Sequence, residues 1–283
     1  MAQNGRRVVD DGGDVHWQQQ PPERIISLVP SWTETLCALG VGERLVGATT
    51  YCVEPREALK DVSRVGGPKN PRLSELCRLR PDLVVVNVEE NRVTDALALR
   101  QAGIPLHVTD PRSVDDAMAS IRRLGEAVGC DAEAERLAGE IEERVKALRR
   151  RNFSRQRAFC PVWSSPWVTC SAHTYTSSVL ELFGLENIYQ EPLSRYPHVE
   201  LEAVRERQPE LVILPDEPYE FTAVDARRLE NFFGVPALIV DGRNLHWYGS
   251  HMKTAFEALE LALLPVQNLP RVLPSGAGER TAV

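Results

Sequence analysis

Short apolar runs alternate with amphipathic segments along most of this chain of 283 residues. In the amphipathic segments, apolar residues recur at three- and four-residue steps, as in helices that bury one face. The strand-like runs are RIISLV, RLVGAT, PDLVVV, IPLHVT, RAFCPVW, PELVIL and VPALIV. Alternation of this kind predicts an α/β fold with mostly parallel sheets.

The two halves of the chain repeat one pattern. RPDLVVVNVEE (80–90) parallels QPELVILPDEP (208–218), and GIPLHVTD (103–110) parallels GVPALIVD (234–241). A looser match joins TETLCALGVGERLVG (33–47) to SSVLELFGLENIYQ (177–190). The repeat predicts two similarly built lobes, an N-terminal lobe over 24–112 and a C-terminal lobe over 154–265.

A segment between the halves has no counterpart in the repeat. From Asp131 to Arg151 the apolar residues fall on one stripe of a helix, while Glu and Arg fill the other positions. The stripe consists of Ala134, Leu137, Ala138, Ile141, Val145 and Leu148. A helix over 131–151 would be about 31 Å long. We therefore expect it to bridge the lobes, within linking helices over 113–153, and to permit only a small hinge.

Both ends of the chain are expected to lie outside the lobes. Residues 1–23 lack the apolar stretch of about 7–15 residues that a secretory signal needs, and we expect a disordered segment. Residues 266–283 are rich in Pro and Gly, which favours a flexible tail. The sequence contains no run of 18 apolar residues that would indicate a membrane span. These features predict a cytoplasmic location, or a periplasmic one if a signal precedes the sequence given.

Charge and cysteine usage exclude several functions. The formal net charge is −7, which argues against a nucleic-acid partner because phosphates require a basic face. The six cysteines form no C-x-x-C pair, so neither a zinc knuckle nor a thioredoxin-type motif is predicted. Reduced thiols are the simplest interpretation.

Aromatic residues of the second half gather in loops that follow predicted strands. They are Trp163, Trp167, Tyr196, Tyr219, Trp247 and Tyr248. Because α/β proteins hold ligands at the carboxyl ends of their strands, these rings could line a pocket for a large, flat, partly apolar molecule. The alternative is ordinary packing of the loops against the lobe.

Acidic residues follow equivalent strands of the two lobes. The segments are NVEEN (87–91) and PDEPYE (215–220), and their candidate ligand contacts are Asn87, Glu89, Glu90, Asp216 and Glu217. Carboxylates that face each other across a cleft could bind a cation, accept hydrogen bonds from amides or perform acid–base chemistry. They could equally be first-turn acids at helix N-termini.

No motif in the chain supports catalysis or a metal site. Ser31 and Glu34 have the S-x-x-E spacing of a helix capping box, which favours a cap over a nucleophile. His173 near Cys170 suggests a Cys–His pair, and Cys52 is another candidate nucleophile, but no surrounding motif supplies a base and a group to orient it. We therefore interpret these thiols as inert and predict no catalytic residue.

The order of these motifs, from RIISLVPSWTETLCALG to GVPALIVD, resembles the helical-backbone (class III) substrate-binding proteins of ABC importers, and most closely their vitamin B12-binding branch. The resemblance implies two Rossmann-like lobes joined by one long helix. It also implies a ligand between the lobes: a corrinoid, haem, an iron-siderophore or a metal ion.

Individual residues can be carried over from this family. Tyr51 matches a tyrosine of the B12 site, Tyr196 stands where that branch has a tryptophan, and Trp163 and Trp167 lie in a loop that supplies a phenylalanine. Two further site tryptophans are replaced here by Val65 and Asn87.

The family also docks onto its importer through one surface glutamate in each lobe. Glu202 matches the glutamate of the second lobe, whereas the first position is Ser74, with Glu75 displaced by about 100° around the helix.

The sequence thus predicts a bilobed protein that binds a cobalamin-like corrinoid or another metal chelate, with no intrinsic cofactor and with importer permease subunits as possible partners. A cytoplasmic enzyme that processes corrinoids or metal chelates, using Cys52 or His173, is one alternative. An iron-siderophore or haem-binding transport protein is another.

Overall fold

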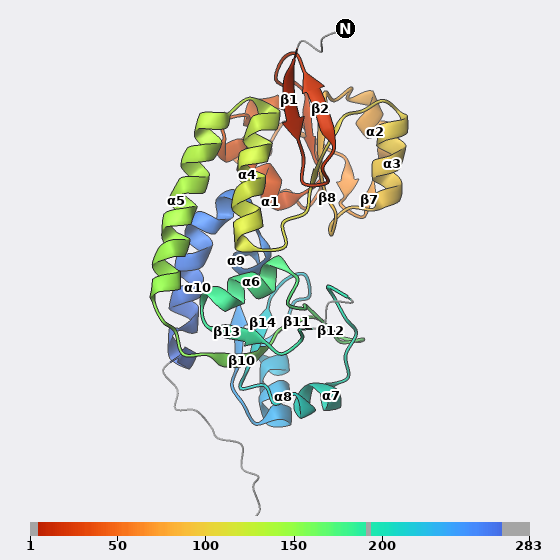
Figure 1. Cartoon of the computed structure of the whole chain (residues 1–283). Coiled ribbons are helices and arrows are strands. Elements are labelled where there is room, and N and C mark those ends of the chain that lie inside the picture. Colours follow the sequence, from red (N-terminus) through yellow and green to blue (C-terminus); the bar gives the residue numbers. More distant parts are fainter. Residues whose placement is uncertain (1–4, 191–193, 268–283) are drawn as a thin grey trace, which may run out of the picture.

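The first lobe is built on a five-stranded parallel sheet of order β5-β4-β3-β8-β9. The computed structural model describes residues 5–190 and 194–267 (Figure 1). The strands are β3 (Ile25–Ser27), β4 (Leu45–Ala48), β5 (Ser63–Arg64), β8 (Leu83–Asn87) and β9 (Leu106–Thr109). The other elements of this lobe are α1 (Pro30–Ala38), α2 (Leu73–Arg78), α3 (Val93–Gln101), the 3-10 helices η1 (Gly42–Arg44) and η2 (Glu57–Leu59), and the hairpin β6 (Gly66–Gly67) and β7 (Asn70–Pro71).

The second lobe has a four-stranded parallel sheet of order β13-β10-β14-β15. Its strands are β10 (Gln156–Phe159), β13 (Leu185–Asn187), β14 (Leu211–Pro215) and β15 (Ala237–Val240). Its other elements are the hairpin β11 (Pro161–Trp163) and β12 (Val168–Thr169), and the helices α6 (Tyr175–Leu182), α7 (Leu201–Glu206), α8 (Ala223–Phe233) and α9 (Gly242–His246). Two parallel sheets with helices between their strands confirm the predicted α/β class.

The internal repeat extends to details of the backbone. Arg80 and Gln208, one residue before the matching prolines, both adopt a positive φ, of 46° and 49°. The acidic residue after each proline accepts a hydrogen bond from the main chain at the start of the first strand. Asp82 Oδ2 accepts from Arg24 N at 2.9 Å, and Glu210 Oε2 accepts from Arg157 N at 2.8 Å. The two lobes therefore use the same local device to start their sheets.

Long helices join the lobes into one unit. They are α4 (Val114–Val128), α5 (Asp131–Arg150) and α10 (Met252–Gln267). Helix α5 runs alongside both lobes, as predicted, and buries its apolar stripe (Figure 1). An ion pair of 2.7 Å between Arg144 and Glu260 ties α5 to α10. Buried apolar residues of both lobes and of these helices form one continuous core, so the connection is stiff.

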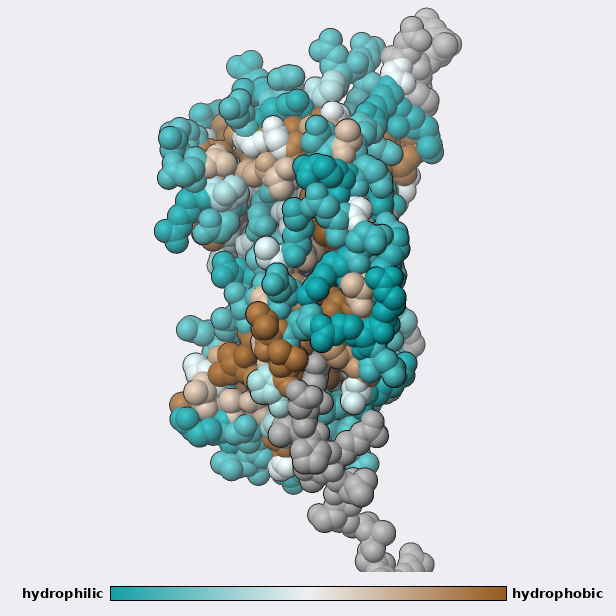
Figure 2. Space-filling view, turned by 90° about the vertical axis from the view of Figure 1, so that its left-hand side faces the viewer, coloured by the Kyte–Doolittle hydropathy of each residue, from teal (hydrophilic) through white to brown (hydrophobic). Residues whose placement is uncertain are grey.

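The side of the molecule on which α5 lies is mostly hydrophilic (Figure 2). One apolar patch stands out in the lower half of this view, and the exposed large apolar residues of α10 are Leu261 and Leu264. Within the described ranges, 5–190 and 194–267, no helix combines the length and apolar character needed to cross a membrane. Helix α10 continues to Gln267, and the rest of the predicted tail lies outside these ranges.

Helix α1 begins differently from the prediction. Its first residue is Pro30, and the preceding Val29 provides no side-chain cap. The expected capping box of Ser31 and Glu34 is therefore wrong, because proline at the first helical position starts the helix before the serine. Glu34 instead reaches the 3-10 helix η3 (Gly249–His251), where Ser250 Oγ donates to its Oε1 at 3.2 Å.

The N-terminal segment is also ordered where disorder was predicted. Strands β1 (Arg6–Val9) and β2 (Val15–Gln18) form an antiparallel hairpin. Asp11 fixes this hairpin to the first lobe: its Oδ2 accepts from Asp110 N at 2.9 Å, and its Oδ1 accepts from Arg123 Nε at 2.6 Å. The prediction overlooked the DDGGD turn between two short strands, and it is wrong for the hairpin, while residues 1–4 lie outside the described ranges.

We expect Asp11→Ala to lower the free energy of unfolding by about 2–3 kcal/mol, because the substitution leaves the half-buried N–H of Asp110 and the Arg123 guanidinium without their acceptor. Urea unfolding followed by circular dichroism measures this change. Asp14→Ala is the matched control, because it removes an exposed ion pair with Arg100 from the same hairpin and should cost less than about 0.5 kcal/mol. Equal losses in both variants would contradict a special role for Asp11.

Candidate functional site

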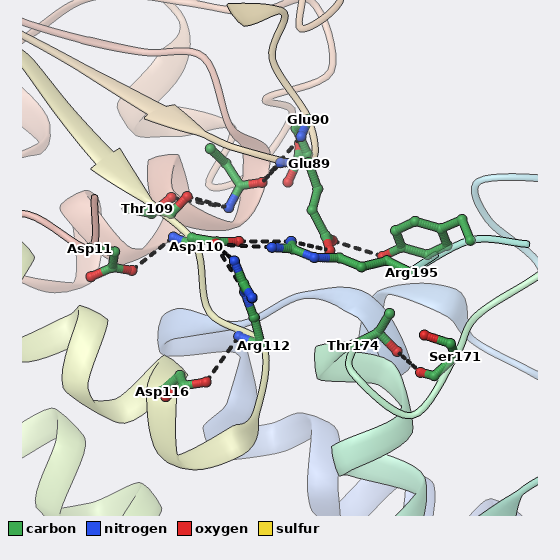
Figure 3. A network of polar contacts seen from close by, with 12 residues as sticks. Asp11, Glu89, Glu90, Thr109, Asp110, Arg112, Asp116, Ser171, Thr174 and Arg195 are labelled. Atoms are coloured by element: carbon green, nitrogen blue, oxygen red, sulfur yellow. Dashed lines mark hydrogen bonds and ion pairs between the residues drawn. The ribbon is translucent and has the colours of Figure 1, made fainter. Parts of the chain in front are cut away.

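Arg195 links the two lobes across the space between their sheets (Figure 3). It lies on the loop before α7 of the second lobe. Its Nη1 donates to Glu89 Oε1 and to Asp110 Oδ1, both at 2.8 Å, and its Nη2 donates to Asp110 Oδ2 at 3.0 Å. Glu89 follows β8, and Asp110 follows β9. The carboxyl edges of the two lobes therefore face each other, as parallel sheets in this arrangement require.

Tyr196 adds a second contact between the lobes. Its hydroxyl donates to Glu89 Oε2 at 2.7 Å, so both carboxylate oxygens of Glu89 are bound by the second lobe. Burial alone would raise the pKa of Asp110, but hydrogen bonds from Arg195 and Arg112 outweigh it and hold this pKa below its ordinary value. Asp110 is thus ionised at neutral pH and forms a charged contact with Arg195.

Glu90 occupies a different environment from its neighbour. Its Oε1 accepts a hydrogen bond of 3.0 Å from the Tyr248 hydroxyl of the second half of the chain. Burial, reinforced by the negative charges of Glu89 and Glu217, raises the pKa of Glu90 to about 7, although Tyr248 and Lys69 act in the opposite direction. Glu90 is therefore partly protonated at neutral pH.

Glu217 stands at the position of the second lobe that corresponds to Glu89. Burial raises the pKa of Glu217, and a hydrogen bond from Trp247 opposes this shift. The neighbouring Asp216 is exposed, and its Oδ1 accepts from Gly242 N at 2.8 Å. A Cβ on Gly242 would lie 2.6 Å from the Glu217 carbonyl oxygen, so glycine lets α9 approach this turn closely.

Three predicted aromatic residues present exposed rings at these edges. Tyr51, after β4, is 65 % exposed, Trp163 in β11 is 44 % exposed, and Tyr196 is 37 % exposed. The Trp163 ring meets Tyr219 edge-on, with centroids 5.4 Å apart. Tyr51 belongs to the first lobe, and Trp163 and Tyr196 belong to the second, so both lobes present aromatic rings at these edges.

Two other predicted contacts, Asn87 and Trp167, pack within their own lobes. Asn87 is 3 % exposed, and its amide holds the turn by donating to Thr109 and accepting from the main-chain N–H groups of Glu89 and Glu90. Its amide is therefore already occupied within the first lobe, and a ligand contact by Asn87 stays a prediction. Trp167 stacks on Phe221 with centroids 6.0 Å apart and packs against the core of its lobe.

Tyr248 is buried between the lobes, and its predicted contact with a ligand stays a prediction. It is 5 % exposed and lies between Trp32 and Tyr175, at centroid distances of 5.1 and 5.6 Å. Its ring belongs to the packing between the lobes, and its hydroxyl reaches Glu90. Trp247 is half-buried against His251, at a centroid distance of 5.5 Å.

The candidates for catalysis are not arranged for it. Cys52 is fully buried, and burial raises the pKa of its thiol despite hydrogen bonds from Thr33 and Thr49. A protonated, inaccessible thiol is a poor nucleophile. His173 is exposed. Among the residues that the structure describes, no group of three or more His, Cys, Asp or Glu side chains is placed to hold a metal ion.

The predicted docking residues lie on the equivalent helices α2 and α7. Glu75 forms ion pairs with Arg72 and Arg78 around its own helix, at 2.6 and 3.7 Å. Glu202 is exposed in the first turn of α7. The glutamate of the second lobe is thus presented to solvent, whereas that of the first lobe is held by arginines.

Arg195 and Asp110 were not predicted as site residues. Arg195 directly precedes Tyr196, and Asp110 ends a repeated motif that ends in Asp241 in the second lobe. These positions could have identified the two residues as candidates. The contact between them depends on the tertiary structure, because local sequence patterns do not specify which acid an arginine meets in the other lobe.

The sequence matches the model of a family described as "Periplasmic binding protein" over residues 25–235. Its relatives include a protein of Pectobacterium carotovorum subsp. carotovorum (strain PC1) named vitamin B12-binding protein. The two are 31 % identical over 207 residues, which is 72 % of this chain and 75 % of the relative.

Solved structures share the fold. The periplasmic vitamin B12 binding protein of Vibrio cholerae superposes with a TM-score of 0.75 at 24 % identity, covering 88 % of this chain and 99 % of that one. The periplasmic haem-binding protein of Roseiflexus sp. RS-1, in its apo form, gives a TM-score of 0.71 at 22 % identity, covering 87 % and 99 %.

Proposed function

The chain belongs to the periplasmic binding protein family, and from this premise we propose that it holds a cobalamin-like corrinoid or another metal chelate between its two lobes. The observation that carries the proposal is the set of exposed rings of Tyr51, Trp163 and Tyr196 at the facing edges of the lobes. A flat macrocycle would cover such rings and remove their apolar surface from water.

The stiffness of the molecule fits a binding role. Helix α5 and the continuous core limit the relative motion of the lobes, so the affinity would come from a largely preformed site. The relatives are named as binding proteins, and the buried, protonated Cys52 offers no nucleophile for a corrinoid-processing enzyme. We therefore propose binding without turnover.

Haem or an iron chelate is the second candidate. Haem-binding proteins share this fold nearly as well as the B12-binding protein does. In addition, Val65 is buried and Asn87 holds a turn, at the two positions where the B12 branch is expected to place tryptophans. A ligand panel separates the two candidates directly.

We expect cyanocobalamin or cobinamide to quench the tryptophan fluorescence of the purified protein, and Trp163→Ala to weaken binding about tenfold because a stacked ring is lost. Isothermal titration calorimetry gives the dissociation constants without relying on a tryptophan signal. Leu261→Ala is the control, since it removes an exposed apolar side chain of α10 and should leave affinity unchanged. If no corrinoid, haem or ferric siderophore binds at high micromolar concentration, the proposal is wrong.

We further propose that the protein delivers its ligand to the permease subunits of an importer in the periplasm. The family and the names of its relatives support this proposal, and exposed Glu202 offers one docking carboxylate. Fractionation of the source cells tests the compartment, and a cytoplasmic protein would contradict this part of the proposal.

A further inference from the structure

Four cations in the described part of the facing edges, Arg195, Arg112, Arg243 and Lys69, already have partners in the protein. This point rests on the proposed function, because it concerns the chemistry of the ligand in that site. Both terminal nitrogens of Arg195 are bound to Glu89 and Asp110. The other nearby cations also donate to protein groups: Arg112 to Asp110, Arg243 to Asp241, and Lys69 to the carbonyl oxygen of Glu89. An anionic ligand group would have to displace one of these contacts.

Two carboxyl groups at the same edges lack such partners. In the described part of the chain, no ion pair joins Glu90 or Glu217 to an arginine or lysine, and their hydrogen bonds come from the neutral donors Tyr248 and Trp247. Glu217 also contributes to the raised pKa of Glu90, so the two carboxyl groups interact across the space between the lobes. Each retains acceptor capacity, because a carboxylate can accept about four hydrogen bonds.

We infer that the cleft selects a ligand whose rim carries hydrogen-bond donors, such as carboxamides, over one whose rim carries carboxylates, with Glu90 and Glu217 as the acceptors. A carboxamide N–H₂ can donate to a carboxylate or to the carbonyl oxygen of its protonated form. A ligand carboxylate placed there would meet like charge at short range, in a partly desolvated site where repulsion is strong.

Two corrinoids that share the same ring and cobalt ion but differ in their peripheral groups can test this inference. Cobinamide and cobyrinic acid share the cobalt corrin, but cobinamide carries amides where cobyrinic acid carries carboxylates. We expect cobinamide to bind at least about 30-fold more tightly at pH 7.5 in calorimetric titrations at low salt. The double variant Glu90→Gln, Glu217→Gln should reduce this ratio at least fivefold, mainly by improving the binding of cobyrinic acid.

Asp14→Asn serves as the control, because it removes a carboxylate on the N-terminal hairpin and should leave the ratio unchanged. Near-ultraviolet and far-ultraviolet circular-dichroism spectra of each variant verify that it is folded. Equal affinity for both ligands, or a ratio unchanged in the double variant, would overturn the inference while the proposed function stands. Tighter binding of cobyrinic acid would overturn it as well and would point to Arg195 as an anchor for anions. Absence of binding by either ligand would count against the proposed function itself.

Discussion

Gly249→Ala is expected to lower the free energy of unfolding by about 2–5 kcal/mol. Gly249 begins η3, which packs on α1, and its φ of 85° is a conformation that side-chain-bearing residues rarely adopt. A Cβ at this position would lie 2.1 Å from Thr35 Oγ1. The alanine therefore adds backbone strain of about 1–2 kcal/mol and a steric overlap that costs a further 1–3 kcal/mol or more. It also disturbs the bond of 2.9 Å from Ser250 N to Thr35 Oγ1.

Gly103→Ala separates the two contributions. Gly103 has a comparable φ of 76°, but nothing lies within 4 Å of a Cβ built on it. We expect this variant to lose only the strain, about 1 kcal/mol. Urea unfolding of both variants, followed by circular dichroism, gives the difference. If both variants lost the same free energy of unfolding, the close contact between η3 and Thr35 of α1 would not contribute to the effect of Gly249→Ala.

The architecture was predictable because it is repeated. Short apolar runs predict the strands of each lobe. The prediction for one lobe supports that for the other, because the two copies share even the glycine and proline of GIPLHVTD and GVPALIVD. Helix α5 was predictable for a different reason, since a stripe of apolar residues at helical spacing has only one plausible structure. Both signals are local in the sequence.

Contacts that cross the molecule were not predictable in this way. Trp163 and Tyr248 were predicted by the same rule, but the Trp163 ring is exposed, whereas Tyr248 is buried. The neighbours of Tyr248, Trp32 and Tyr175, come from distant segments. The link from Arg195 to Asp110 spans 85 positions. Its geometry depends on how the lobes meet, which no local pattern specifies.

Glu90→Gln is expected to stabilise the protein at pH 8 by about 2–3 kcal/mol and to have little effect below pH 4.5. In the folded protein, burial raises the pKa of Glu90 from its ordinary 4.5 to about 7. Folding therefore favours the protonated acid, so the native protein loses stability progressively as the pH rises from 4.5 to about 7, with the full loss above 7. Glutamine stays neutral and can still accept the hydrogen bond from Tyr248, so the variant avoids this loss.

The adjacent Glu89→Gln should have the opposite effect, because Glu89 accepts from the cation Arg195 and from Tyr196. We expect it to destabilise the protein at pH 7 by about 1 kcal/mol, since a charge-assisted contact between the lobes becomes a neutral one. Unfolding curves of the native protein and both variants at pH 4.5, 6 and 8 test the pair. The charged and polar groups that act on Glu90 are Glu89, Lys69, Tyr248 and Glu217. If Glu90 were an ordinary surface carboxylate, Glu90→Gln would not stabilise the protein at pH 8. Two neighbouring glutamates with opposite responses would therefore show that the edge of the first lobe uses the charge of Glu89 to join the lobes and buries Glu90 at a cost in stability above its pKa.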